Sequence, residues 1–133
     1  MPKPKKPNKK SLVKKLQKKA ENLWKLFCRN RDKVCQLCGS QEVLQVHHIF
    51  SRKSKGLFLD VDNGILLCRS CHCKVSFSDD GLKEKIRRLK IKKDEATYDR
   101  LYEQSLEKKP FLEWKNIEYL EMQIKILTEL LED

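Results

Sequence analysis

The sequence of 133 residues lacks any apolar run near the length of about 20 residues that a membrane-spanning helix needs. No apolar segment follows the basic first residues either, so nothing in the sequence resembles a secretory signal. From these two absences we expect no membrane partner and a cytoplasmic location. In a reducing cytoplasm, paired cysteines are more often metal ligands or redox groups than disulfides.

Apolar residues are scarce as well, at 39% of the sequence against 37% for charged residues. A chain of this size and composition has too little apolar material to build a large core over a broad sheet. The composition predicts instead one small domain with helical flanks and a centre that a bound metal stabilises.

The net charge of +11 lies in one part of the chain. Residues 1–34 contain 13 lysines and arginines and two acidic residues, whereas the remaining 17 basic and 17 acidic residues balance each other. Such an arm favours a polyanionic partner, most simply the backbone of a nucleic acid. The alternative is a tail that only keeps the protein soluble.

Residues 1–10, with three prolines and five lysines, are predicted to be disordered until a partner binds them. A helix is then predicted from Ser11, as its N-cap, to about Asn30. Its apolar residues recur at steps of three and four along one stripe: Leu12, Leu16, Ala20, Leu23 and Phe27.

The middle of the chain predicts strand, loop, strand and helix, in that order. Residues 43–50 are rich in β-prone side chains, residues 51–59 form a basic loop, and residues 60–64 are typical of a turn. A short strand over residues 65–67 then leads into a helix that reaches about Phe77.

The remainder predicts helices over residues 82–92, 95–108 and 113–133, with Pro110 ending the second. The last helix carries an apolar seam about two heptads long. We expect this helix to pack on the domain, and a homodimer through the same helix is the alternative. Its two lysines and six acidic residues argue against contact with DNA.

Four of the six cysteines form two CxxC pairs: Cys35, Cys38, Cys68 and Cys71. Two such pairs supply four thiolates, which make a closed, structural zinc site. The alternatives are a thioredoxin-type redox pair, which the lack of a surrounding βαβ pattern disfavours, or unrelated cysteines. Cys28 and Cys73 fall outside the spacing and are expected to be plain thiols, although Cys73 could compete as a ligand.

All three histidines lie between these pairs or directly after them: His47, His48 and His72. Neighbouring residues of a strand point to opposite faces, so one of the adjacent histidines could bind a metal while the other meets a substrate. Closing the zinc site could bring His72 near His47, and two imidazoles would leave the metal open to catalysis. The alternative is that the histidines are spare or belong to the structural site.

This order of residues, with Asn63 and Gly64 between the histidine pair and the second CxxC, resembles the HNH endonuclease family of the ββα-metal fold. It is similar in particular to phage-type members with a four-cysteine zinc centre, including the NinG-like recombination nucleases. The resemblance covers about residues 31–77 and implies an α+β fold, with a zinc-stapled core and helical extensions at both ends. It also implies a metal-dependent DNA hydrolase in a bacterial or phage-infected cell.

The resemblance implies a role for each residue of the motif. His48 matches the general base that takes a proton from the attacking water, and Asn63 matches the residue that braces the loop and orients that base. His47 and His72 match ligands of a catalytic divalent metal, for which Mg²⁺, Mn²⁺, Ni²⁺ and Zn²⁺ are the candidates. Some relatives have a further histidine ligand where this sequence has Ser76.

We therefore expect three regions: a basic arm and helix over residues 1–33, the catalytic core over residues 34–80 and a helical extension over residues 81–133. The candidate DNA contacts are basic residues of the first two regions: Lys14, Lys15, Lys18, Arg52, Lys53, Lys55 and Lys74. The competing function is a zinc-ribbon module that binds nucleic acid without chemistry. No pattern in the sequence predicts a preferred DNA sequence.

Overall fold

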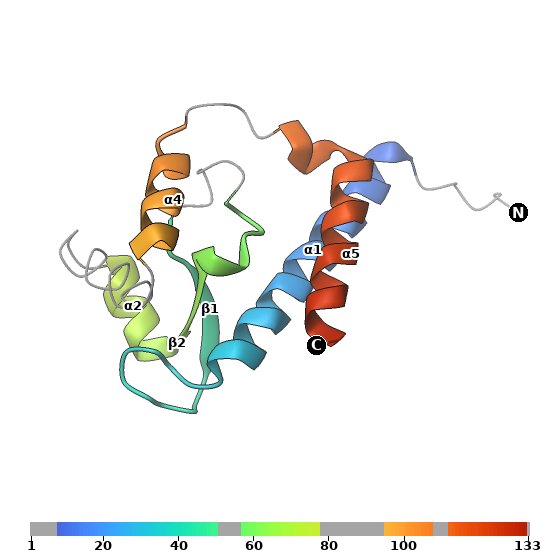
Figure 1. The fold of residues 1–133 in the computed structure, drawn as a ribbon. Helices are drawn as coiled ribbons and strands as arrows, with labels where there is room; N and C mark the ends of the chain where they lie inside the picture. The colour runs from blue at the N-terminus through green and yellow to red at the C-terminus, as the bar shows by residue number, and fades with distance from the viewer. Residues whose placement is uncertain (1–7, 51–56, 78–94, 108–111, 133) are drawn as a thin grey trace, which may run out of the picture.

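The computed structural model describes residues 8–50, 57–77, 95–107 and 112–132. It is an α+β fold, as predicted, with a small sheet between helical ends (Figure 1). The helix predicted over residues 82–92 lies outside the described residues. In chain order the elements are α1 (Lys9–Asp32), β1 (Leu44–His48), the 3-10 turn η1 (Val61–Asn63), β2 (Gly64–Cys68), α2 (Arg69–Phe77), α4 (Glu95–Ser105), the 3-10 turn η2 (Leu112–Lys115) and α5 (Ile117–Glu132).

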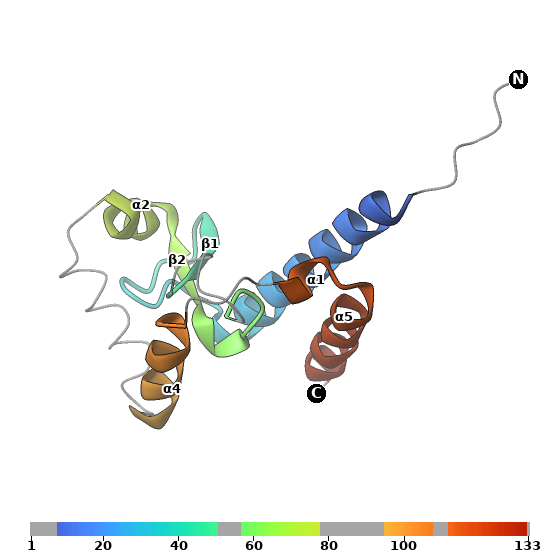
Figure 2. The same cartoon turned by 90° about the horizontal axis from the view of Figure 1, so that it is seen from above.

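The two strands pair antiparallel, with Leu44 opposite Cys68 at one end and His48 opposite Gly64 at the other. All residues of β2 are buried, because α1 and α2 both pack on it, whereas β1 is half-buried along most of its length. Seen from above, the strands lie between α2 and α1 (Figure 2). The predicted order of strand, loop, strand and helix is confirmed, with strand ends that differ from the prediction by one or two residues.

Helix α1 begins earlier than the sequence predicts. Asn8 is the N-cap, and its side-chain oxygen accepts a hydrogen bond of 2.8 Å from the amide of Ser11. Lys9 and Lys10, which we predicted to be disordered, are therefore helical. The physical reason is that a capped first turn adds hydrogen bonds at little cost once the rest of the helix is packed.

The buried face of α1 also differs from the predicted stripe. Val13, Ala20, Trp24 and Cys28 are buried, whereas Leu12 is 38% exposed. The tertiary partner decides the face here, because the large Trp24 ring packs against the start of β2. A Cβ atom on Gly64 would clash with the Cys28 sulfur and would lie 2.8 Å from Trp24 Cζ2, so glycine permits this close approach.

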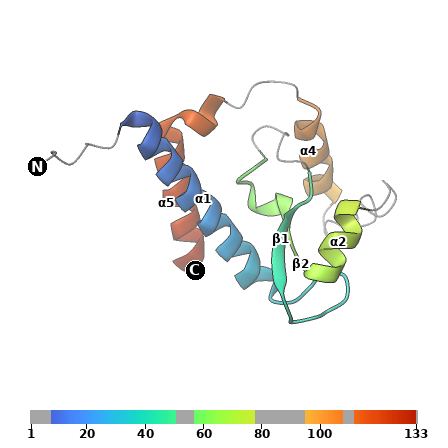
Figure 3. The same ribbon diagram turned by 180° about the vertical axis from the view of Figure 1, so that it is seen from behind.

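Helix α5 packs along α1, which confirms the prediction that the last helix covers the domain (Figure 3). Its buried residues, Leu120 and Leu127, lie seven positions apart and share one face of the helix. A homodimer through α5 stays a prediction. In the part of the chain that the structure describes, no helix combines the length and apolar character needed to cross a membrane.

Candidate functional site

The four cysteines of the two CxxC pairs converge at the end of the sheet where β1 starts and β2 finishes. Their Sγ atoms all lie within 4.8 Å of one another, and the sulfurs of Cys38 and Cys68 are 3.6 Å apart. Four sulfurs around one zinc ion, each at about 2.3 Å, stand roughly 3.8 Å apart in a tetrahedron. None of the four forms a disulfide, which would need about 2.05 Å. The cluster therefore fits a structural zinc ion.

The four thiols differ in how readily they ionise. Burial raises the pKa of the Cys71 thiol, and the neighbouring sulfurs of Cys68 and Cys38 raise it further. Burial opposes ionisation of Cys35 too, but backbone amides of Cys68, Cys38 and Leu37 donate to its sulfur and lower its pKa to about 6. One thiolate is thus available near neutral pH, and a cation would ionise the others.

Local backbone geometry holds both cysteine pairs in place. In the first pair, the Gly39 amide donates to the Cys35 carbonyl at 2.8 Å, and Gly39 has a φ of 77° that glycine adopts without strain. In the second, the Cys71 amide donates to the Cys68 sulfur at 3.4 Å as α2 begins. Cys73 is exposed on α2 and does not belong to the four-cysteine cluster.

His47 and His72 meet across the gap between β1 and α2. Their ring centroids are 5.2 Å apart and the ring planes cross at 72°. Two imidazoles that share one ion through bonds of about 2.0–2.1 Å would place their centroids about 5 Å apart. Within the described ranges, the four cysteines form the only group of three or more potential ligands, so no third protein ligand joins the histidine pair there. An ion held by these two rings would keep open positions.

His48 lies on the other face of β1, against α1. Its ring stacks on that of Trp24, with centroids 4.2 Å apart and planes 13° apart, and on that of Phe58, at 4.8 Å and 23°. Its Nε2 atom is 3.0 Å from the Phe58 carbonyl oxygen. Because a carbonyl only accepts, Nε2 carries the proton and Nδ1 of the neutral ring carries the lone pair. The structure therefore places His48 with aromatic rings and not at the His47–His72 pair.

Asn63 closes the loop that follows β1. Its side chain is fully buried, its Oδ1 accepts from the Phe50 amide at 2.8 Å, and its Nδ2 donates to the carbonyls of Phe50 at 3.2 Å and Leu57 at 3.0 Å. Its backbone carbonyl accepts from the Ile49 amide at 2.8 Å. Asn63 thus ties together the two ends of the loop next to His48.

The sequence did not indicate the residues that fix α1 on the free edge of β2. Arg31 donates to the carbonyls of Val61 at 2.6 Å and Gly64 at 2.7 Å, and the Asp32 carboxylate accepts from the Leu66 amide at 3.0 Å. Burial opposes the charge on Arg31, but the hydrogen bonding to Asp32 and the nearby negative charges together outweigh it and raise the pKa of the guanidinium. No sequence pattern could have identified this contact, because it joins residues about 30 positions apart.

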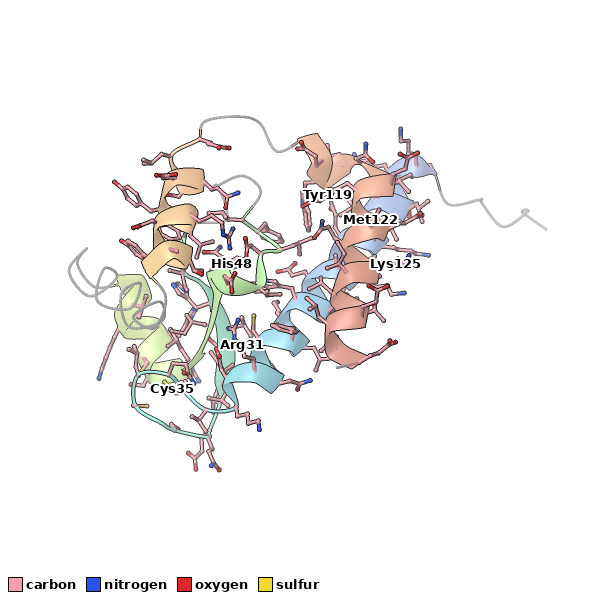
Figure 4. The ribbon with its side chains drawn as sticks, in the orientation of Figure 1. Arg31, Cys35, His48, Tyr119, Met122 and Lys125 are labelled. Carbon is pink, nitrogen blue, oxygen red and sulfur yellow. The ribbon has the colours of Figure 1, made fainter. Side chains whose placement is uncertain are left out.

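Figure 4 shows Cys35 and His48 at opposite ends of the sheet, with Arg31 beside the sheet at the end of α1.

The candidate DNA contacts divide into three groups. Lys14, Lys15 and Lys18 are exposed on the half of α1 that runs beside α5, away from α2 (Figure 1). Lys74 is exposed on α2. The remaining candidates lie outside the described residues: Arg52, Lys53 and Lys55.

Two antiparallel strands and a helix, stapled by four cysteines, define a small metal-site core of the ββα class. Residues 35–77 match the family model described as HNH endonuclease, so the resemblance seen in the sequence is confirmed for this segment. The match covers about a third of the chain and indicates a nuclease-type function. No curated protein and no solved structure matches the chain in the two other comparisons.

Proposed function

We propose that this protein is a metal-dependent DNA endonuclease that hydrolyses phosphodiester bonds, nicking or cleaving duplex or branched DNA. The observation that carries the proposal is the contact between His47 and His72, inside a segment that matches the HNH endonuclease model. A pair of imidazoles beside a separate four-cysteine cluster supports two metal sites with different tasks. The cysteines hold structural zinc, and the histidines hold the catalytic ion.

When bound, the catalytic ion, which is Mg²⁺, Mn²⁺, Ni²⁺ or Zn²⁺, supplies positive charge that stabilises the scissile phosphate and the leaving oxygen. His48 accepts a proton from the attacking water at Nδ1, while the Phe58 carbonyl holds the Nε2 proton. In this proposal the scissile phosphate lies at the end of β1, with the metal on the face of His47 and the base on the face of His48. Asn63 holds Phe50 and Leu57 together and so supports the end of β1 where the base lies.

The three regions predicted from the sequence are then given separate tasks. In this proposal, residues 34–80 carry the chemistry, residues 1–33 supply charge for DNA, and the C-terminal region of residues 81–133 covers α1 through α5. The four-cysteine cluster supports a reducing, cytoplasmic location, since thiolates must stay unoxidised to hold zinc. A role in phage recombination stays a prediction.

The test is cleavage of a supercoiled plasmid by the full chain in the presence of Mg²⁺, Mn²⁺ or Ni²⁺, with and without EDTA. Replacing His48 with alanine (His48→Ala) should lower the rate roughly 10²- to 10⁴-fold, which is the usual contribution of a general base. Zinc content and circular dichroism should stay at wild-type values. Gln45→Ala is the matched control, because Gln45 lies on the same strand with an exposed side chain.

Two outcomes would count against the proposal. If His48→Ala cleaves at the wild-type rate, His48 is not the base. If the wild-type protein retards DNA in a gel but cleaves it with none of the metals, the chain is a zinc-stapled module that binds nucleic acid without chemistry.

A further inference from the structure

Trp24 lies outside the HNH segment and contacts the proposed base directly. Its indole stacks nearly parallel on the His48 imidazole, with centroids 4.2 Å apart. We propose that Trp24 is a positioning residue for the cleavage reaction, because it fixes the plane of the His48 ring. This inference rests on the proposed function, and it assigns a part in catalysis to α1.

Trp24 is itself held firmly. Its side chain is fully buried, and its Nε1 donates to the Asp60 carbonyl at 2.8 Å. It packs in a cluster with Cys28, Leu59 and Leu127, which come from three separate parts of the chain. A ring fixed in this way offers a rigid flat surface.

Phe58 also stacks on the His48 ring, with centroids 4.8 Å apart. Phe58 in turn makes a T-shaped contact with Trp114, with centroids 4.6 Å apart and planes at 61°. An imidazole stacked on two aromatic rings cannot tilt without losing contact with one of them. Since Nε2 is also held by the Phe58 carbonyl, the direction of the Nδ1 lone pair is fixed. Holding a reacting group in one orientation lowers the entropic part of the barrier.

The aromatic residues around His48 include two that the family match does not cover. Phe58 lies within residues 35–77, but Trp24 belongs to α1 and Trp114 to η2. The absence of a Cβ at Gly64 lets α1 approach closely enough for the stack. The ββα core alone would therefore carry a less ordered base than the full chain does.

The experiment compares Trp24→Leu, Trp24→Phe and the wild type as full chains, on plasmid DNA with Mn²⁺. Trp24→Leu removes the flat surface, whereas Trp24→Phe keeps an aromatic face but loses the hydrogen bond to Asp60 and part of the buried ring volume. Leu120→Ala is the control for a purely structural role, because it removes buried volume from α5 one heptad away from Leu127. All rates are measured at a temperature at which every variant is folded by circular dichroism.

We expect Trp24→Leu to lower the single-turnover cleavage rate at saturating protein roughly 10- to 100-fold, with DNA affinity changed less than about two-fold. Trp24→Phe should recover most of the rate, and Leu120→Ala should cleave like the wild type. The ring protons of His48, assigned in NMR spectra with His48→Ala, should move downfield in Trp24→Leu as the indole ring current is lost. A wild-type rate for Trp24→Leu, or an equal loss of rate in Leu120→Ala, would overturn the inference.

The same experiment separates this inference from the proposed function. If His48→Ala cleaves DNA at the wild-type rate, the proposed role of His48 as base and the role of Trp24 both fail, because no base needs positioning. If His48→Ala is inactive while Trp24→Leu cleaves normally, the proposed function stands and the role of Trp24 is wrong.

Discussion

At the scale of single residues, Asn63 shows how one buried side chain supports the site. It is the one fully buried polar side chain among the described residues, and its amide makes three hydrogen bonds across the ends of the loop after β1. Removal of this amide would leave its backbone partners without hydrogen bonds. An unpaired buried polar group costs more free energy than the hydrogen bond itself contributes. The position therefore tolerates neither a smaller nor a charged residue.

We predict that Asn63→Ala lowers the free energy of unfolding by about 2–4 kcal/mol, from three hydrogen bonds of roughly 0.5–1.5 kcal/mol each. Asn63→Asp keeps the acceptor for the Phe50 amide but turns an oxygen toward the two carbonyls of Phe50 and Leu57. Burial and these carbonyls disfavour the charged form, so we expect Asn63→Asp to be the less stable variant at pH 7. Denaturant unfolding of both variants measures the difference.

The pH dependence distinguishes the two variants. A buried aspartate has a pKa above its ordinary value of about 3.9, so the folded state binds more protons than the unfolded one in the window above 3.9. The stability of Asn63→Asp should therefore rise relative to Asn63→Ala as the pH falls from about 7 to about 5. A constant difference across this range would show that residue 63 is not enclosed by carbonyl groups.

At the scale of elements, β1, β2 and α2 depend on the four-cysteine cluster. It joins the start of β1, the end of β2 and the first turn of α2, and these are short elements with little apolar area of their own. The binding energy of a structural zinc ion is then also folding energy. The prediction is that metal removal unfolds this part of the protein.

Replacing Cys68 with serine should release zinc and abolish the cooperative thermal transition, and a strong chelator should do the same to the wild type. Cys73→Ser is the matched control, because Cys73 lies on the same helix, is exposed and stands outside the cluster. Zinc content by mass spectrometry and circular dichroism during heating are the measurements. A Cys68→Ser protein that keeps its zinc and its melting temperature would contradict the assignment of the four cysteines as a structural zinc site.

The elements also show which parts of the fold the sequence could predict. The cysteine pairs and the order of strand, loop, strand and helix are local patterns, and they were predicted correctly. The buried face of α1 was predicted only in part: Ala20 and Leu23 pack as expected, but Leu12 is exposed and Trp24 is buried, because β2 and α5 decide which side is covered. Strand alternation predicted that His47 and His48 point apart. It could not predict the Trp24 stack, which joins residues 24 positions apart.

At the scale of the whole molecule, three of the candidate DNA contacts lie away from the proposed metal ligands. Lys14, Lys15 and Lys18 stand on the half of α1 beside α5, and a helix of 24 residues is about 36 Å long. His72 lies past the other end of α1, on α2. Contacts made by these lysines would therefore add affinity at phosphates distant from the cleaved bond and would carry no sequence information.

The last prediction is that Lys14→Gln, Lys15→Gln and Lys18→Gln together weaken DNA binding without changing the cleavage rate at saturating protein. Each lost phosphate contact lowers the slope of log affinity against log salt by about 0.9, so the slope should become shallower by about 2.7. Glutamine has nearly the helix propensity of lysine, so α1 should stay folded. Lys125→Gln is the control, because Lys125 is exposed on the acidic helix α5 (Figure 4). An unchanged slope in the triple variant, or an equal change in Lys125→Gln, would show that DNA does not follow this half of α1.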